Sequence, residues 1–142
     1  MTGYVVDASI VVKWLVKEEW STEASSLLEG GATLIAPELL YAEVSNALWA
    51  MRRRGDIGEE DFVDATDALK VAPVSVPFSM RQLVASASRL AADLDHPVYD
   101  CFYLALAVHE QYPVVTADLR FHRKVSSHPY LSDRVTYITG LT

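Results

Sequence analysis

The sequence predicts an α/β fold, a three-layer α/β/α sandwich around a mostly parallel sheet of four or five strands. Short apolar runs end abruptly in polar residues, as buried strands do, and they alternate with stretches of helical periodicity. Helices between such strands are typical of parallel sheets, whose strands need crossover connections. Strands are expected at residues 4–6, 33–36, 73–77, 112–116 and 134–138, and helices at 9–16, 21–28, 37–53, 58–70, 80–94 and 98–108.

Glycine and proline mark several boundaries of these elements. Two glycines at 30–31 follow the second helix, where glycine permits a left-handed C-cap, and Gly55 is expected to end the third helix in the same way. Pro37 suits the first turn of that third helix, because its missing N–H would have no partner there. The strongly periodic helix over 80–94 breaks before Pro97.

Length and composition predict one globular domain over residues 1–142. Hydrophobic residues make up 51% of the chain and charged residues 22%, which is unlike a disordered sequence. No apolar run is long enough to span a membrane, and no basic region leads into an apolar stretch at the N-terminus, so neither export nor a membrane partner is expected. The single cysteine, Cys101, allows no internal disulfide and no cysteine-cluster zinc site, which favours a cytoplasmic protein.

The net charge of −7 argues against a module that coats nucleic acid, because such modules are usually basic. A nuclease remains compatible with this charge, since carboxylates that hold Mg²⁺ add negative charge at the site itself. Surface acidity is also an ordinary property of a solvated face. No two of the four histidines have metal-ligand spacing on one helix, so a zinc site is not expected.

Two carboxylates directly follow predicted strands. The apolar run 4–6 leads into Asp7, with Ser9 two positions later, and a second apolar run ends at Thr116 just before Asp118. The carboxyl ends of parallel strands are where open α/β sheets bind their ligands. Taken alone, this segment favours Asp7 as merely the N-cap of the next helix, because Asp and Ser are both good N-caps.

Two further carboxylates belong to predicted helices. Glu43 falls on or beside the apolar stripe of helix 37–53, where a carboxylate is costly to bury unless it pairs or binds a cation. A solvent-facing place at the margin of the stripe is the alternative for Glu43, and Asn46 would stand next to it. Asp100 lies in the first turn of a helix that is apolar nearly all round. There the helix dipole favours it, and a site at the sheet edge would meet the start of the helix.

Right-handed crossovers can bring all four carboxylates to one edge of the sheet. They would then repel one another unless a divalent cation neutralised them, and ligation by oxygen alone selects Mg²⁺ or Mn²⁺ over zinc. The chemistry natural to such a site is phosphodiester hydrolysis, with one or two ions that activate water and stabilise the leaving oxygen. Each carboxylate has a structural explanation of its own, and it is their joint placement that predicts a site.

Four short segments follow one another in a recognisable order: Val5-Val6-Asp7-Ala8-Ser9, then Pro37 with Glu43 six positions on, then Tyr99-Asp100-x-x-Tyr103-x-Ala105-x-Ala107, then Thr116-Ala117-Asp118-x-x-Phe121. In this order and spacing they resemble the motifs of PIN-domain ribonucleases, and most of all the VapC-like toxins of bacterial and archaeal toxin–antitoxin pairs. The match spans essentially the whole chain and implies a PIN-like fold. One departure is Cys101, where alanine is usual after the aspartate.

The resemblance implies a metal-dependent endoribonuclease, the toxin of a toxin–antitoxin pair, which cuts RNA, often tRNA or ribosomal RNA, with metal-activated water. It also implies a homodimer that is silenced by a VapB-like antitoxin. Arg120, Arg123 and Lys124 are candidates for RNA contact, because they closely follow Asp118 and phosphates attract cations. The residues implied to bind Mg²⁺ or Mn²⁺ are Asp7, Glu43, Asp100 and Asp118, with Ser9, Thr116 and Asn46 beside them.

Two other functions stay open at this point. A non-catalytic PIN-like module would bind RNA or a protein without cutting; a missing acid would favour it, yet all four are present. A nuclease of the same kind would act in RNA processing or on DNA, without a toxin role. A small upstream reading frame that encodes a DNA-binding antitoxin would favour the toxin.

Overall fold

The computed structural model describes residues 2–141, and at its centre lies a parallel sheet. Four strands form the sheet within these residues, in the order β2-β1-β3-β4, and all neighbouring strands are parallel. The chain runs from β1 to β2 on one side and then crosses to β3 on the other, so the strand order reverses between β1 and β3. Such a switch point is where α/β sheets bind ligands. The strands are β1 (Gly3–Val6), β2 (Thr33–Ile35), β3 (Val114–Thr116) and β4 (Val135–Tyr137).

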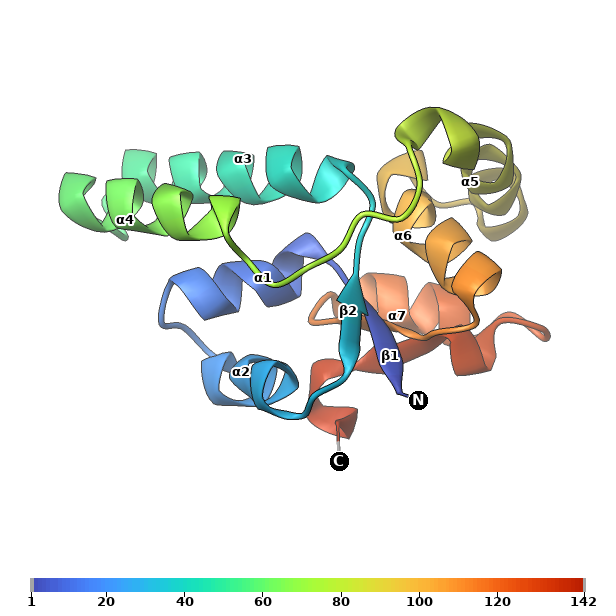
Figure 1. The fold of residues 1–142 in the computed structure, drawn as a ribbon. Coiled ribbons are helices and arrows are strands. Elements are labelled where there is room, and N and C mark those ends of the chain that lie inside the picture. The colour runs from blue at the N-terminus through green and yellow to red at the C-terminus, as the bar shows by residue number, and fades with distance from the viewer. Residues whose placement is uncertain (1, 142) are drawn as a thin grey trace.

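Helices cover both faces of the sheet, as predicted for a three-layer α/β/α fold (Figure 1). Figure 1 shows α1 and α2 on one side of the strands and α6 and α7 on the other, with α3 and α4 side by side as a pair. A fifth helix, α5, packs against α6. The bounds are α1 (Ala8–Leu15), α2 (Ser21–Glu29), α3 (Leu39–Arg54), α4 (Glu59–Lys70), α5 (Met80–Leu94), α6 (Val98–Glu110) and α7 (Leu119–Ser126), with short 3-10 turns η1 (Ser132–Arg134) and η2 (Ile138–Gly140).

The core explains why the strand residues are apolar on both faces. Val5, Val6, Val114 and Val115 are fully buried, as expected for central strands of a parallel sheet covered on both sides. Helix α6 supplies a run of six buried residues, which confirms the prediction that it packs deep against the sheet.

Three details of the sequence prediction are wrong. The segment 73–77 is not a strand: Ser75 makes one isolated bridge to Ile35, and the prolines at its two ends have no N–H with which to extend a ladder. Helix α3 begins at Leu39 with Glu38 as its N-cap, so Pro37 precedes its first turn. The sequence analysis also assigned no helix to residues 119–126, where α7 lies.

The predicted C-cap of α3 is confirmed, because Gly55 has the left-handed conformation with φ of 82°. No helix within residues 2–141 combines the length and the apolar character that a membrane crossing requires.

Candidate active site

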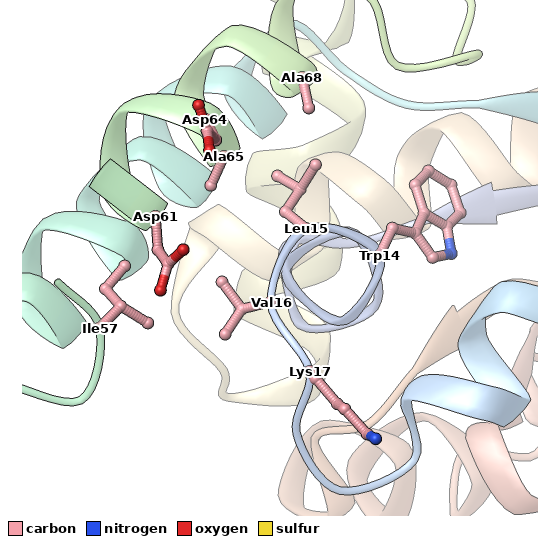
Figure 2. A pocket seen from close by; sticks show the side chains of 9 residues that line it. All are labelled: Trp14, Leu15, Val16, Lys17, Ile57, Asp61, Asp64, Ala65 and Ala68. Atoms are coloured by element: carbon pink, nitrogen blue, oxygen red, sulfur yellow. The ribbon is translucent and has the colours of Figure 1, made fainter. Parts of the chain in front are cut away.

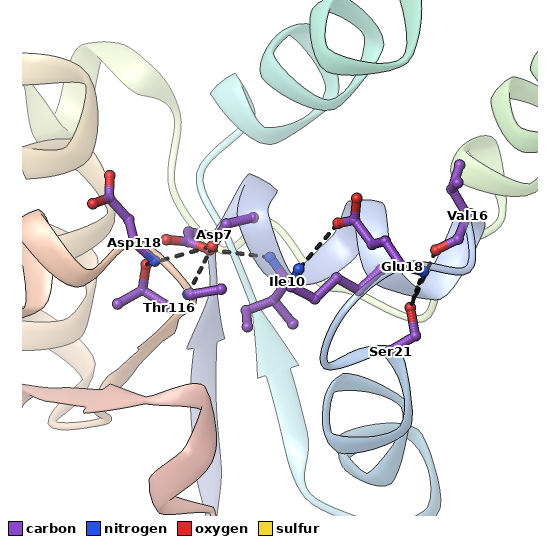
Figure 3. Close-up of polar contacts among 10 residues, drawn as sticks. Asp7, Ile10, Val16, Glu18, Ser21, Thr116 and Asp118 are labelled. Carbon is purple, nitrogen blue, oxygen red and sulfur yellow. Dashed lines mark hydrogen bonds and ion pairs between the residues drawn. The ribbon is translucent and has the colours of Figure 1, made fainter. Parts of the chain in front are cut away.

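Asp7 and Thr116 lie side by side where β1 and β3 end. Val6 pairs with Val115 in the sheet, so the next residue of each strand stands at the same level. Asp7 is 5% exposed and Thr116 is fully buried. Figure 3 shows both with Asp118 at this edge, which is the switch point of the sheet.

Asp7 is the N-cap of α1, as one of the two explanations of its position predicted. Its Oδ1 accepts a hydrogen bond from the backbone N–H of Ile10 at 3.2 Å and another from the Ser9 hydroxyl at 2.5 Å. Both hydrogen bonds go to the same oxygen. Capping therefore does not exclude a second role for this carboxylate, and the two explanations are compatible.

Ser9 and Thr116 tie the ends of the two strands together. Ser9 Oγ accepts a hydrogen bond from the backbone N–H of Ala117 at 2.9 Å, and it lies 3.4 Å from Thr116 Oγ1. Thr116 Oγ1 in turn accepts a hydrogen bond from the backbone N–H of Asp118 at 3.0 Å. The two hydroxyl groups thus fix the position of Asp7 relative to the turn that carries Asp118.

Glu43 is half-buried on α3, and its carboxylate has a partner. Tyr103 on α6 donates a hydrogen bond from its hydroxyl to Glu43 Oε1 at 2.6 Å. Glu43 thus has a hydrogen-bond partner, as expected for a glutamate beside the apolar stripe of α3. The sequence analysis did not identify Tyr103 as that partner. A signal existed, because Tyr103 lies three residues after Asp100 and so shares its face of α6.

Asp100, at the start of α6, is paired with His96. The His96 Nε2 atom lies 2.7 Å from Asp100 Oδ2, and 30% of the Asp100 side chain is exposed. Its negative charge acts on both Asp7 and Glu43 and raises their pKa values. Asp100 therefore lies within electrostatic reach of both Asp7 and Glu43, and the three carboxylates come from three separate parts of the sequence.

Burial shifts the pKa values of the groups in this cluster. It raises the pKa of Asp7 from 3.8 to about 7, with a smaller contribution from the charge of Asp100, although hydrogen bonds from Ser9 and Thr116 oppose the shift. The pKa of Glu43 is also raised, first by burial and then by Asp100, against the hydrogen bond from Tyr103. Burial and the neighbouring Glu43 raise the pKa of Tyr103 far above its usual range, so its hydroxyl keeps its proton and serves as a donor.

Asp118 and Asn46 are more exposed than these three carboxylates. Asp118 caps α7, and its Oδ1 accepts a hydrogen bond from the backbone N–H of Phe121 at 3.2 Å. It is brought to the same edge as Asp7 (Figure 3). Asn46 lies on the exposed side of α3, and no hydrogen bond of its side chain joins it to the acids within the described part of the chain.

The predicted RNA-contact residues line one cavity on α7. Arg120, Arg123, Lys124 and Ser127 surround a space of about 360 Å³. The Lys124 ammonium is already engaged, because it donates hydrogen bonds to the carbonyl oxygens of Leu94 and Asp95, each at 3.2 Å. The two arginines take part in none of the ion pairs between residues 2 and 141.

The donor set of the cluster fits a hard divalent cation. All four predicted ligands are carboxylates, and no lysine or arginine pairs with any of them within residues 2–141. Carboxylate oxygens that no lysine or arginine neutralises are suitable ligands for Mg²⁺ or Mn²⁺. The side chains as they stand are not a preassembled cage, because no three His, Cys, Asp or Glu residues of the described chain are grouped closely enough to hold an ion. Metal binding would therefore require these side chains to come closer together.

Several cavities lie near α1, and one of them borders the cluster. This space of about 380 Å³ between α1 and α3 is lined by Ser9 and Ala117 and by the cationic side chains of Lys13 and Arg54. Another, of about 410 Å³, lies between the end of α1 and α4 (Figure 2). It is lined by Asp61 and other residues that the sequence analysis did not assign to the site.

The fold and this edge of the sheet are those of a PIN domain. The family model for the PIN domain matches residues 4–126, and the chain belongs to this family. The chain is 31% identical over 127 residues to ribonuclease VapC3 of Pyrobaculum aerophilum, an alignment that covers 84% of this chain and 92% of that protein.

Solved structures of low sequence identity share the fold. The protein PAE2754 of Pyrobaculum aerophilum superposes with a TM-score of 0.68 at 19% identity, covering 97% of this chain and 85% of the other. VapBC2 from Rickettsia felis, bound to a DNA fragment from their promoter, gives 0.63 at 15% identity over 94% and 97%. Mycobacterium tuberculosis VapC20, described as a toxin that cleaves the sarcin–ricin loop, gives 0.64 at 16% identity over 85% and 94%.

Proposed function

We propose that this chain is a metal-dependent endoribonuclease, built as a single PIN domain, and that it is the toxin of a toxin–antitoxin pair. The observation that carries the proposal is the placement of Asp7, Glu43 and Asp100 around the switch point of the sheet, where no lysine or arginine within residues 2–141 pairs with them. The relative named ribonuclease VapC3 supports RNA as the substrate.

Asp7, Glu43, Asp100 and Asp118 would hold the ion, which when bound supplies an activated water and stabilises the departing oxygen of the phosphodiester. The other residues keep these carboxylates in place. The Ser9 hydroxyl donates a hydrogen bond to Oδ1 of Asp7 and none to Oδ2.

Tyr103 has a similar part in this proposal, because it holds Oε1 of Glu43 and stays protonated in its buried position. Burial of Asp7 removes water from one side of the site. Electrostatic interactions with a bound cation are stronger in such a place than in bulk water.

Two cationic surfaces support binding of the RNA backbone next to this site. Arg120 and Arg123 line the cavity on α7, which begins directly after Asp118. Lys13 and Arg54 line the cavity between α1 and α3, which Ser9 borders. We assign RNA contact to the two arginines of α7 first, because Lys13 and Arg54 already pair with Glu18 and Asp56. Lys124 is a weaker candidate than the sequence analysis made it, since its ammonium holds two carbonyl groups.

The partners in this proposal are a second copy of the chain and a VapB-like antitoxin. The Rickettsia felis VapBC2 complex supports an antitoxin of this type. Exposed apolar side chains on the α3–α4 pair, including Trp49 and Val63, support a further protein contact. The substrate is an RNA such as tRNA or ribosomal RNA, and the structural similarity to VapC20, a toxin that cleaves the sarcin–ricin loop, supports the latter. The place of action is the cytoplasm, where the free Cys101 thiol would stay reduced.

One observation favours a second candidate, a PIN module that binds RNA or a protein without cutting it. The described residues contain no preassembled group of three metal-ligating side chains. A nuclease of RNA processing without a toxin role is a third candidate. A neighbouring gene for a small DNA-binding antitoxin separates it from the toxin.

The experiment that tests the proposal is mapping of cleavage sites in total RNA after expression of the protein is induced. Asp7→Asn serves as the inactive variant. Asp61→Asn, an exposed acid on α4, serves as the matched control because it carries the same chemical change outside the cluster. New RNA ends and growth arrest are expected with wild type and Asp61→Asn but not with Asp7→Asn. Equal cleavage by Asp7→Asn would refute the assignment, and absence of cleavage by wild type would favour the non-catalytic module.

A further inference from the structure

His96 lies in the short loop between α5 and α6, where the sequence analysis assigned it no role. Its side chain is only 4% exposed, and its Nε2 atom lies 2.7 Å from Oδ2 of Asp100. The other ring nitrogen, Nδ1, is buried and has no hydrogen-bond partner within the described residues. A buried polar side chain is thus directed at one carboxylate of the proposed active site and at no other polar group.

The orphaned Nδ1 atom determines how the neutral ring binds Asp100. A buried N–H without an acceptor loses its hydrogen bond to water and gains nothing in exchange, which is costly. The proton of the neutral imidazole therefore belongs on Nε2, since only there does it have an acceptor. His96 then donates a hydrogen bond to Asp100 Oδ2 and holds that oxygen in one direction.

The loop that carries His96 is fixed from the side of α7. Asp95, the C-cap of α5, has a left-handed backbone with φ of 50°, a conformation that residues other than glycine rarely adopt. Lys124 donates hydrogen bonds to the carbonyl oxygens of Leu94 and Asp95. The Phe121 ring lies 5.3 Å from the His96 ring, centroid to centroid. The imidazole therefore packs against Phe121, and the two hydrogen bonds from Lys124 hold the residues just before it.

We propose that His96 is a positioning residue for Asp100, and that Lys124 holds the loop that makes this possible. The inference rests on the proposed function, because it assumes that Asp100 is a metal-binding carboxylate. Hydrogen bonds that orient a ligand in this way typically contribute a factor of ten to a hundred to metal affinity. Lys124 accordingly acts through the loop, and not through contact with RNA.

The test measures Mn²⁺ affinity of the full chain by calorimetry in the absence of RNA, beside the thermal midpoint of each variant. His96→Phe keeps an aromatic ring beside Phe121 but removes the donor, and it is expected to weaken Mn²⁺ binding at least tenfold. His96→Gln keeps a donor and is expected to recover part of the loss. Lys124→Met is expected to weaken binding less than His96→Phe does. His109→Phe, the same change at an exposed histidine in the last turn of α6, is expected to bind as wild type does.

The outcomes separate this inference from the proposed function. If wild type binds Mn²⁺ and His96→Phe binds it equally well, the positioning role is refuted while the proposed function stands. If His96→Gln is as weak as His96→Phe at an unchanged thermal midpoint, the donor is not what matters and the inference also fails. If wild type itself neither binds Mn²⁺ nor cleaves RNA, the proposed function fails and the positioning role falls with it.

Discussion

Replacing Asp7 with asparagine is expected to stabilise the metal-free protein at alkaline pH. Asparagine can still accept the hydrogen bonds from Ile10 and Ser9 and is a good N-cap, so the fold should be kept. What the substitution removes is a negative charge on a side chain that is 5% exposed and forms no ion pair within residues 2–141. The charge of Asp7 therefore lowers the stability of the fold, although the proposed activity requires it.

The magnitude follows from the pKa of Asp7, which burial raises from 3.8 to about 7 in the folded protein. Between these two values the folded state binds more protons than the unfolded state, so the free energy of unfolding falls as the pH rises. At about 1.4 kcal/mol for each pKa unit, ionised Asp7 costs the folded protein about 4 kcal/mol above neutral pH. The cost is small near pH 4, where the carboxyl group is protonated in the folded state and only about half ionised in the unfolded state.

Urea unfolding with EDTA measures this effect directly. At about pH 8, Asp7→Asn should exceed wild type in free energy of unfolding by about 4 kcal/mol, and at about pH 4 by less than about 1 kcal/mol. Asp61→Asn should differ little from wild type at either pH, because that acid is exposed. A pH-independent difference, or a variant less stable than wild type at pH 8, would show that the burial argument is wrong.

Three further predictions follow from the same cluster and its surroundings. Tyr103→Phe should lower the free energy of unfolding by about 1–2 kcal/mol and reduce RNA cleavage, because Glu43 loses its buried donor; an unchanged rate in a folded variant would exclude a role for this bond. Arg120→Ala combined with Arg123→Ala should raise KM for RNA and lower the salt dependence of binding by about 1.4 in log–log slope, as measured by fluorescence anisotropy; an unchanged slope would place the RNA elsewhere. Mg²⁺ at about a hundred times its Kd should stabilise wild type by about 2.7 kcal/mol in thermal unfolding but leave Asp7→Asn unaffected, and equal stabilisation of both would place the ion outside the cluster.

Strand and helix periodicity predicted most of this fold. The apolar runs that contain β1 and β3 and the periodic stretch of α5 carry strong local signals, and the bounds of α5 agree with the prediction. Residues 73–77 did not form the expected strand. Strand formation depends on pairing with a neighbouring strand, and the prolines at both ends of this segment limit its pairing with β2 to one bridge at Ser75. Helix α7 was missed because its eight residues are mostly polar and cationic, with Phe121 and Val125 alone buried.

The sequence predicted the acidic residues of the candidate site, but it did not predict the roles of Tyr103 and His96, which form hydrogen bonds with two of them. Glu43 has a partner, as expected for a glutamate beside an apolar stripe, but that partner, Tyr103, lies 60 positions away and only the tertiary fold brings the two together. His96 was passed over because it was considered only as a metal ligand, where it has no second histidine at ligand spacing. Lys124 was assigned to RNA because of its charge, although its ammonium faces two carbonyl groups that no sequence pattern reveals.

The central claim is that the carboxylates at the switch point hold a divalent cation. Titration of Mn²⁺ into the protein, followed by electron paramagnetic resonance of the free ion, tests it without depending on the choice of RNA. Wild type and Asp61→Asn should remove Mn²⁺ from solution with the same affinity, and Asp7→Asn, Glu43→Gln and Asp100→Asn should each bind it at least tenfold more weakly. Binding of Mn²⁺ by Asp7→Asn and Asp100→Asn as tightly as by wild type would contradict the claim.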